Sequence, residues 1–141
     1  ATAIKGNLTV EDLPELELTY APPFGSAKDV VNMAGYAALN IMEGVARNIQ
    51  LHELDEARES GALLVDVRTE AEFNRGSIPG FVNFPLNELR DNMDQLPKDK
   101  ELILSCHSGQ RSYIAARMLE QHGFKVKNLD GSYLLYEAVN R

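Results

Sequence analysis

At 141 residues, with 44% hydrophobic and 25% charged side chains, the chain has the size and composition of one ordinary globular domain, or of a small domain with an appendage. Its net charge of −7 disfavours nucleic acid and anionic membrane as partners, because both require a basic protein surface. No apolar run reaches bilayer length, no basic leader opens the chain, and the single cysteine excludes an intrachain disulfide, so we expect a protein of the reducing cytoplasm.

The first 47 residues predict a helical arm. Thr9 is placed to start a short helix, and the prolines at 22–23 interrupt any regular element. Apolar residues then keep helical spacing from Ala27 to Val45, after an N-cap pair formed by Ser26 and Asp29. A lone amphipathic helix cannot bury its own apolar stripe, so we expect residues 13–45 to dock on the following domain, on a second chain or on a part of the protein missing here.

From residue 48 onward, short apolar strands alternate with short helices. Such alternation predicts an α/β fold with a mainly parallel sheet and helices on both faces, here over residues 48–141. Thr69 and Glu72 have the spacing of a capping box at the start of one helix. In chain order we expect a lead-in at 48–50, a helix over 51–57 with Gly61 behind it, a strand over 63–65, the short helix capped at 69, a strand over 81–84, a helix from 86, a strand up to 105, a helix up to the stop at Gly123, a strand over 125–129 and a helix from Gly131.

The only cysteine lies at a strand-to-helix turn. Leu102 to Leu104 form a wholly apolar run before Cys106, and the apolar period becomes helical after Arg111. Ligands of open α/β sheets bind at the carboxyl ends of the strands. Backbone amides at the start of a helix carry partial positive charge, which favours an anion or a thiolate, and Arg111 adds a full charge.

The residues around Cys106 suit a tight anion-binding loop in which Gly109 is free to take positive φ. A bland alternative is that Cys106 is merely a small buried hydrophobe. We expect the site to consist of the candidate catalytic residues Cys106 and Arg111 and the candidate substrate-binding residues His107, Ser108, Gly109, Gln110 and Ser112.

Several segments resemble the rhodanese sulfurtransferases over about residues 49–141. They are the C-x4-R loop from Cys106 to Arg111, the D-V-R segment 66–68 followed by Glu72-Phe73, the turn 76–80, and the segments 83–86 and 129–131. The resemblance implies that Cys106 carries sulfane sulfur as a persulfide. The donor would be thiosulfate, polysulfide or a low-molecular-weight persulfide such as coenzyme A persulfide, and a thiol would accept the sulfur. The chain departs from the family pattern at Ser77, Ser132 and Tyr136.

The sequence leaves two roles open for each of the supporting residues. Arg111 either orients an anionic donor or ties the loop down through its carbonyls. Asp66 and Arg68, at the end of a neighbouring strand, either brace the loop or form a structural ion pair. His107 is expected at the rim of the loop rather than as the general base, and no residue cluster has metal-ligand spacing.

The segment 12–35 closely resembles the end of the dimerisation domain of flavin-dependent pyridine nucleotide–disulfide oxidoreductases, in particular coenzyme A-disulfide reductase and NADH-dependent persulfide reductase. Some members carry a rhodanese domain at the C-terminus, so the chain is read as a C-terminal piece of such an enzyme. The alternative is a self-contained protein with a helical arm. The resemblance implies FAD, NAD(P)H and coenzyme A for the full-length parent only, no cofactor in this stretch, and a possible homodimer through residues 13–45.

Two other functions remain open. One is a cysteine phosphatase or arsenate reductase that uses the Cys106–Arg111 loop for an oxyanion. Those loops resemble C-x5-R, so the shorter loop here is expected to be too small for a tetrahedral oxyanion. The other is an inactive rhodanese-like interaction module.

Overall fold

The computed structural model of the chain describes residues 2–19, 21, 23–25 and 28–140 and divides into two compact units, Ala1–Val45 and Ala46–Arg141. The division falls in the connection between the helix α2 (Val30–Met42) and the strand β1 (Asn48–Ile49). The boundary predicted between residues 47 and 48 lies in the same connection. No helix in these described ranges is long and apolar enough to cross a bilayer.

The first unit contains α1 (Thr2–Lys5), the 3-10 helix η1 (Leu13–Glu15) and α2. The Asp29 carboxylate accepts a hydrogen bond of 2.9 Å from the Val31 amide and so caps α2. The predicted helix from Ala27 to Val45 is therefore too long. Asp29 is extended, and Gly44 takes φ +70° just after the helix, a left-handed conformation that ends it. Ser26 and Ala27 lie outside the described residues.

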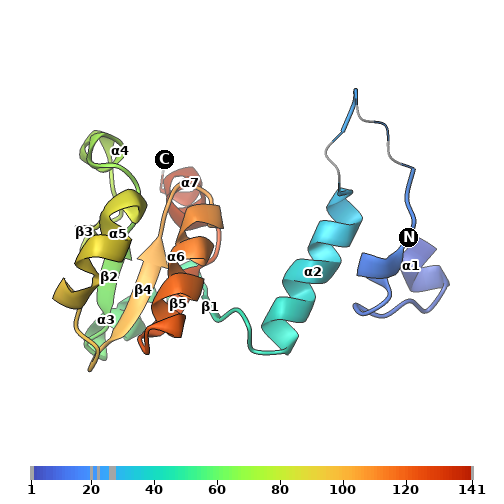
Figure 1. The fold of residues 1–141 in the computed structure, drawn as a ribbon. Helices are drawn as coiled ribbons and strands as arrows, with labels where there is room; N and C mark the ends of the chain where they lie inside the picture. The colour runs from blue at the N-terminus through green and yellow to red at the C-terminus, as the bar shows by residue number, and fades with distance from the viewer. Residues whose placement is uncertain (1, 20, 22, 26–27, 141) are drawn as a thin grey trace. The chain divides into compact units, whose positions relative to one another are not determined.

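The second unit is built on a five-stranded parallel sheet in the order β1-β5-β4-β2-β3 (Figure 1). All four strand pairings are parallel, which confirms the predicted α/β class. The central register aligns Leu64 with Ile103 and Leu104 with Asn128. The strands are β1, β2 (Leu63–Asp66), β3 (Val82–Asn83), β4 (Glu101–Ser105) and β5 (Lys125–Leu129).

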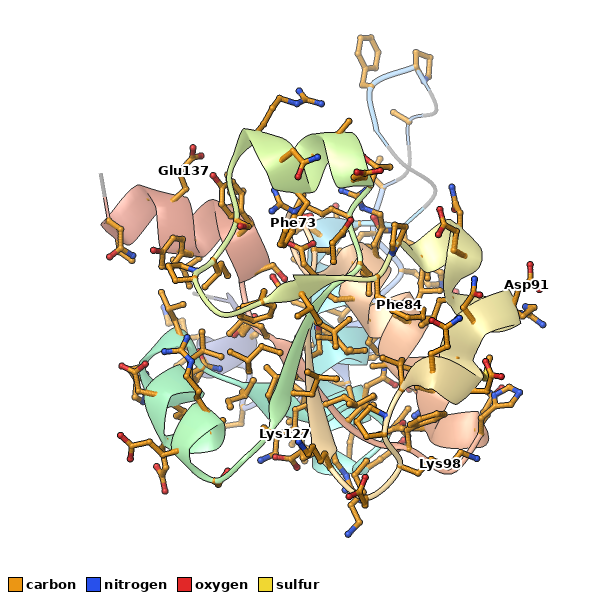
Figure 2. The ribbon with its side chains drawn as sticks, turned by 90° about the vertical axis from the view of Figure 1, so that its left-hand side faces the viewer. Phe73, Phe84, Asp91, Lys98, Lys127 and Glu137 are labelled. Carbon is orange, nitrogen blue, oxygen red and sulfur yellow. The ribbon has the colours of Figure 1, made fainter. Side chains whose placement is uncertain are left out.

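Helices cover both faces of this sheet. One apolar cluster holds Leu89 and Leu119 against Leu104, and the other holds Leu54 against Ile103, because successive strand residues point to opposite faces. Phe84 packs against the first cluster and Phe73 against the second (Figure 2). The helices are η2 (Leu51–Glu53), α3 (Leu54–Glu59), α4 (Glu70–Arg75), α5 (Leu86–Asn92), η3 (Met93–Gln95), α6 (Gln110–Gln121) and α7 (Ser132–Val139).

The segment expected as a lead-in at 48–50 contains a strand instead. Asn48 and Ile49 form β1, which pairs with β5 at Asn128 and Leu129 and closes one edge of the sheet. Two residues are too few for an alternating pattern to appear in the sequence, so only the pairing reveals this strand.

Candidate active site

Cys106 directly follows β4, at the carboxyl edge of the sheet, and opens the loop of residues 106–111, hereafter the Cys106 loop. Gly109 caps the start of α6 with φ +105°, the left-handed conformation that its position in the loop predicts. The Cys106 side chain is 1% exposed, so the sulfur lies within the loop rather than on the surface.

Two polar groups donate to the sulfur of Cys106. The Gly109 amide lies 3.1 Å from Sγ and the Ser112 hydroxyl lies 3.4 Å from it. Burial is the largest single influence on this thiol and raises its pKa. Hydrogen bonds from Ser112, Gly109 and Ser108 together outweigh burial, and the pKa of Cys106 lies below the ordinary value of a cysteine. The loop therefore favours the thiolate, the nucleophilic form.

The start of α7 holds the carbonyl side of the Cys106 loop. The Tyr133 amide donates to the Cys106 carbonyl at 3.1 Å, and the Leu134 amide donates to the His107 carbonyl at 2.9 Å. The Ser132 hydroxyl accepts from the Cys106 amide at 3.2 Å and donates to the Leu129 carbonyl at 3.1 Å. These contacts fix the backbone from which the sulfur projects.

Ser132 has an unusual backbone conformation for a serine. Its φ is +48°, in the left-handed region, and its side chain is fully buried. A glycine would adopt this conformation without strain, whereas serine does so at a cost. Serine adds an acceptor for the Cys106 amide, a buried group that costs free energy when left unpaired.

Asn128 of β5 also contacts the Cys106 loop. Its Nδ2 lies 3.4 Å from the Gly109 carbonyl, while its buried Oδ1 has no hydrogen-bond partner among the described residues. This contact helps to fix the carbonyl of Gly109, the residue whose amide lies next to the Cys106 sulfur.

Arg111 is paired with a carboxylate from α4. Its two terminal nitrogens donate to the two Glu72 oxygens at 2.8 and 2.7 Å. These two contacts direct the guanidinium to the Glu72 carboxylate rather than to the loop carbonyls considered from the sequence. Arg111 holds the pKa of Glu72 well below its usual range against the effect of burial, and Glu72 raises the pKa of Arg111.

Asp66 and Arg68 form a buried ion pair. The Asp66 side chain is 0% exposed and that of Arg68 3%, and the guanidinium binds both carboxylate oxygens at 2.8 to 3.1 Å. Arg68 also donates to the Gly76 carbonyl at 2.8 Å and lies 4.1 Å over the Tyr133 ring. The geometry is that of a structural pair that reaches the Cys106 loop through Tyr133.

The other predicted site residues divide by exposure. His107, Ser108 and Gln110 are exposed, whereas Ser112 is buried beside the sulfur. His107 thus lies at the rim, as its position next to the nucleophile suggests. Among the described residues, no three His, Cys, Asp or Glu side chains gather as metal ligands would.

Sequence reasoning missed three contributors to this site. Glu72 was recognised as a capping residue and as part of a family-like segment, but not as the partner of Arg111, although the same carboxylate accepts from Thr69 and from Arg111. Ser132 was noted only as a departure from the family pattern. The Tyr133 amide carries no sequence signal at all, because every residue but proline has one.

A family model described as the rhodanese-like domain matches residues 50–138. The crystal structure of reduced Bacillus anthracis CoADR-RHD is 54% identical, with a TM-score of 0.92 over 98% of this chain and 25% of that one. A NAD-dependent persulfide reductase from A. fulgidus is 37% identical, with a TM-score of 0.78 over 93% and 23% of the two chains. A sulfurtransferase of Allochromatium vinosum is 40% identical over 52% of this chain and 70% of its own length. The present chain thus spans about a quarter of each of the two solved structures.

Proposed function

The chain belongs to the rhodanese-like domain family, and from this premise we propose that it is a sulfurtransferase which carries sulfane sulfur as a persulfide on Cys106. One observation carries the proposal. The buried Cys106 sulfur accepts hydrogen bonds from the Gly109 amide and the Ser112 hydroxyl, groups suited to hold an anion there. The sulfurtransferase among its relatives supports the same reaction class.

In the first step the Cys106 thiolate attacks the outer sulfur of a donor such as thiosulfate, polysulfide or a low-molecular-weight persulfide. A new S–S bond forms at Cys106, and the donor's S–S bond breaks. The electron pair leaves on the donor's inner sulfur, as sulfite from thiosulfate or as a thiolate from an organic persulfide. The amides and hydroxyl that held the thiolate are in place to hold the new terminal sulfur.

In the second step an acceptor thiolate attacks the terminal sulfur and Cys106 leaves as the thiolate. The 141 residues contain no second cysteine, so the acceptor belongs to another molecule or to another part of a longer chain. We propose thiols, including coenzyme A, as acceptors. Each step exchanges one S–S bond for another, so neither step needs an oxidant or a reductant.

We propose that the chain works as part of a disulfide or persulfide reductase in the cytoplasm, where a reactive thiolate stays reduced. The A. fulgidus relative, named as a persulfide reductase, supports this context. FAD, NAD(P)H and coenzyme A would then bind to the remainder of the parent enzyme. Exposed apolar side chains on α2, among them Val30 and Met33, support the proposal that residues 13–45 form a dimer interface.

Intact-protein mass spectrometry tests the sulfurtransferase function. After brief treatment with thiosulfate, polysulfide or glutathione persulfide in separate samples, we expect the mass of one added sulfur, which dithiothreitol removes. The Cys106→Ser variant should remain unmodified while keeping the circular dichroism of the wild type. Absence of added sulfur with every donor would favour an interaction module. Hydrolysis of an aryl phosphate through Cys106, without sulfur transfer, would favour the phosphatase alternative.

A further inference from the structure

The guanidinium of Arg111, the last residue of the Cys106 loop, is already paired with a carboxylate. Both ends of Arg111 bind Glu72, and the side chains are 35% and 29% exposed, respectively, so the pair borders solvent. Glu72 is itself fixed, because its carboxylate accepts from the Thr69 amide at 3.0 Å and from the Thr69 hydroxyl at 2.9 Å. The pair is near enough to the nucleophile that a negative charge on Cys106 raises the pKa of Arg111.

This pairing changes the charge that an incoming donor meets. Arg111 and Glu72 together are neutral, and the four residues between Cys106 and Arg111 are His, Ser, Gly and Gln, of which only a protonated His107 adds a full positive charge. A doubly charged donor must either leave Glu72 in place and feel its repulsion, or displace it from a bidentate pair. A donor with a single negative charge loses less binding free energy by either route.

We infer that Glu72 determines donor specificity at this site, by holding Arg111 and thereby selecting against a dianionic sulfur donor such as thiosulfate in favour of a monoanionic organic persulfide. The inference rests on the proposed sulfurtransferase function and narrows its donor class. In the favoured reaction, the Cys106 thiolate bonds to the outer sulfur of the donor anion R–S–S⁻, the donor S–S bond breaks, and the outer sulfur stays on Cys106 as a terminal persulfide anion. The electron pair leaves on R–S⁻, which is released as the thiol once it takes up a proton from water.

The Glu72→Gln variant isolates this charge. Glutamine retains the capping-box contact to Thr69, so α4 keeps its start, while Arg111 loses its ion-pair partner. A unit charge about 6 Å away, at the dielectric constant of water, alters the affinity for each unit charge by about threefold. The variant should therefore raise kcat/KM by about tenfold for thiosulfate and about threefold for a singly charged persulfide, shifting their ratio by about threefold.

The control is Glu70→Gln, which makes the same change in net charge at an exposed residue in the first turn of the same helix. The full chain is given either thiosulfate or 2-hydroxyethyl persulfide, and sulfur on Cys106 is followed by rapid quench and mass spectrometry. Each wild-type rate is divided by the rate of the same donor with N-acetylcysteine, a different thiol, in solution. Normalised in this way, wild type should prefer the persulfide, and Glu70→Gln should leave the donor ratio unchanged.

The possible failures are distinguishable. If wild-type Cys106 takes sulfur from both donors but the ratio is the same in Glu72→Gln, the inference is wrong and the sulfurtransferase function stands. If wild type prefers thiosulfate after normalisation, the inference is also wrong, whether or not the variant folds. If wild type takes sulfur from neither donor, the proposed function fails and the inference fails with it.

Discussion

Replacing Ser112 by alanine tests whether hydrogen bonds make Cys106 acidic. The Ser112 hydroxyl lies 3.4 Å from the Cys106 sulfur and 3.1 Å from the Gly109 carbonyl oxygen. It has one proton and donates to one acceptor at a time. A thiolate is a stronger acceptor than a neutral thiol, so ionisation of Cys106 favours the orientation that points the hydroxyl at sulfur. Alanine removes this response and leaves the Gly109 amide in place.

The size of the effect follows from the charge on the acceptor. A hydrogen bond to a charged group contributes about 1.5 to 3 kcal/mol, and about 1.4 kcal/mol corresponds to one pKa unit. Loss of the donor disfavours the charged form, so Ser112→Ala should raise the pKa of Cys106 by about one to two units. Alanine is the best helix former and Ser112 lies within α6, so the helix should persist.

The assay is the rate of alkylation by iodoacetamide as a function of pH. In the wild type the rate should fall only as the pH drops through a midpoint lower than that of an ordinary cysteine, because the folded loop lowers the pKa. Ser108→Ala is the matched control, since Ser108 is exposed and acts on the sulfur through its backbone amide. Equal midpoints in Ser112→Ala and wild type would refute the reasoning, as would an equal rise in both variants.

Three further outcomes are expected. Ser132→Ala removes the acceptor of the Cys106 amide and keeps the positive φ, so it should lower the free energy of unfolding by about 2 kcal/mol, and Ser132→Gly by about 1 kcal/mol less; urea denaturation measures both, and wild-type stability in the alanine variant would contradict the role of this hydroxyl. One glycine inserted between Gly109 and Gln110 should move the Gly109 amide away from the sulfur and abolish sulfur loading by mass spectrometry; retained loading would show that loop length is unimportant. A chain beginning at Ala46 keeps every element of the second unit and should load sulfur at the wild-type rate, whereas its unfolding by circular dichroism would make the arm part of the core.

Local signals in the sequence predicted much of the second unit. The capping box of Thr69 and Glu72, the apolar run before Cys106 and the glycine at 109 each act over a few residues, and each has the predicted structure. The parallel sheet followed from the alternation of strands and helices, since parallel strands need a crossover between them. For the same reason Cys106 was correctly placed at a strand-to-helix turn.

The contacts that the sequence did not predict join distant residues. Arg111 and Glu72 are 39 positions apart, and their pairing depends on how β2 and β4 bring the ends of two loops together. The Cys106 amide and the Ser132 hydroxyl are 26 positions apart. A side chain offers the same donors and acceptors wherever it lies, so its residue type alone does not select the partner. The predicted length of α2 was wrong for a local reason, because the apolar spacing continues past the glycine that ends the helix.

In the Cys106 loop, two backbone carbonyls bind α7 while a backbone amide faces the sulfur. This arrangement stabilises an anion without a free cation. The carbonyls of Cys106 and His107 accept from α7 amides, at 3.1 and 2.9 Å, and so are held away from the sulfur. The Gly109 amide, at 3.1 Å, is left to face it. The charge of Arg111 is matched by Glu72, so dipoles at contact distance hold the negative charge. Dipoles fixed in this way serve a thiolate and a terminal persulfide sulfur alike, and the loop need not rearrange as sulfur arrives and departs.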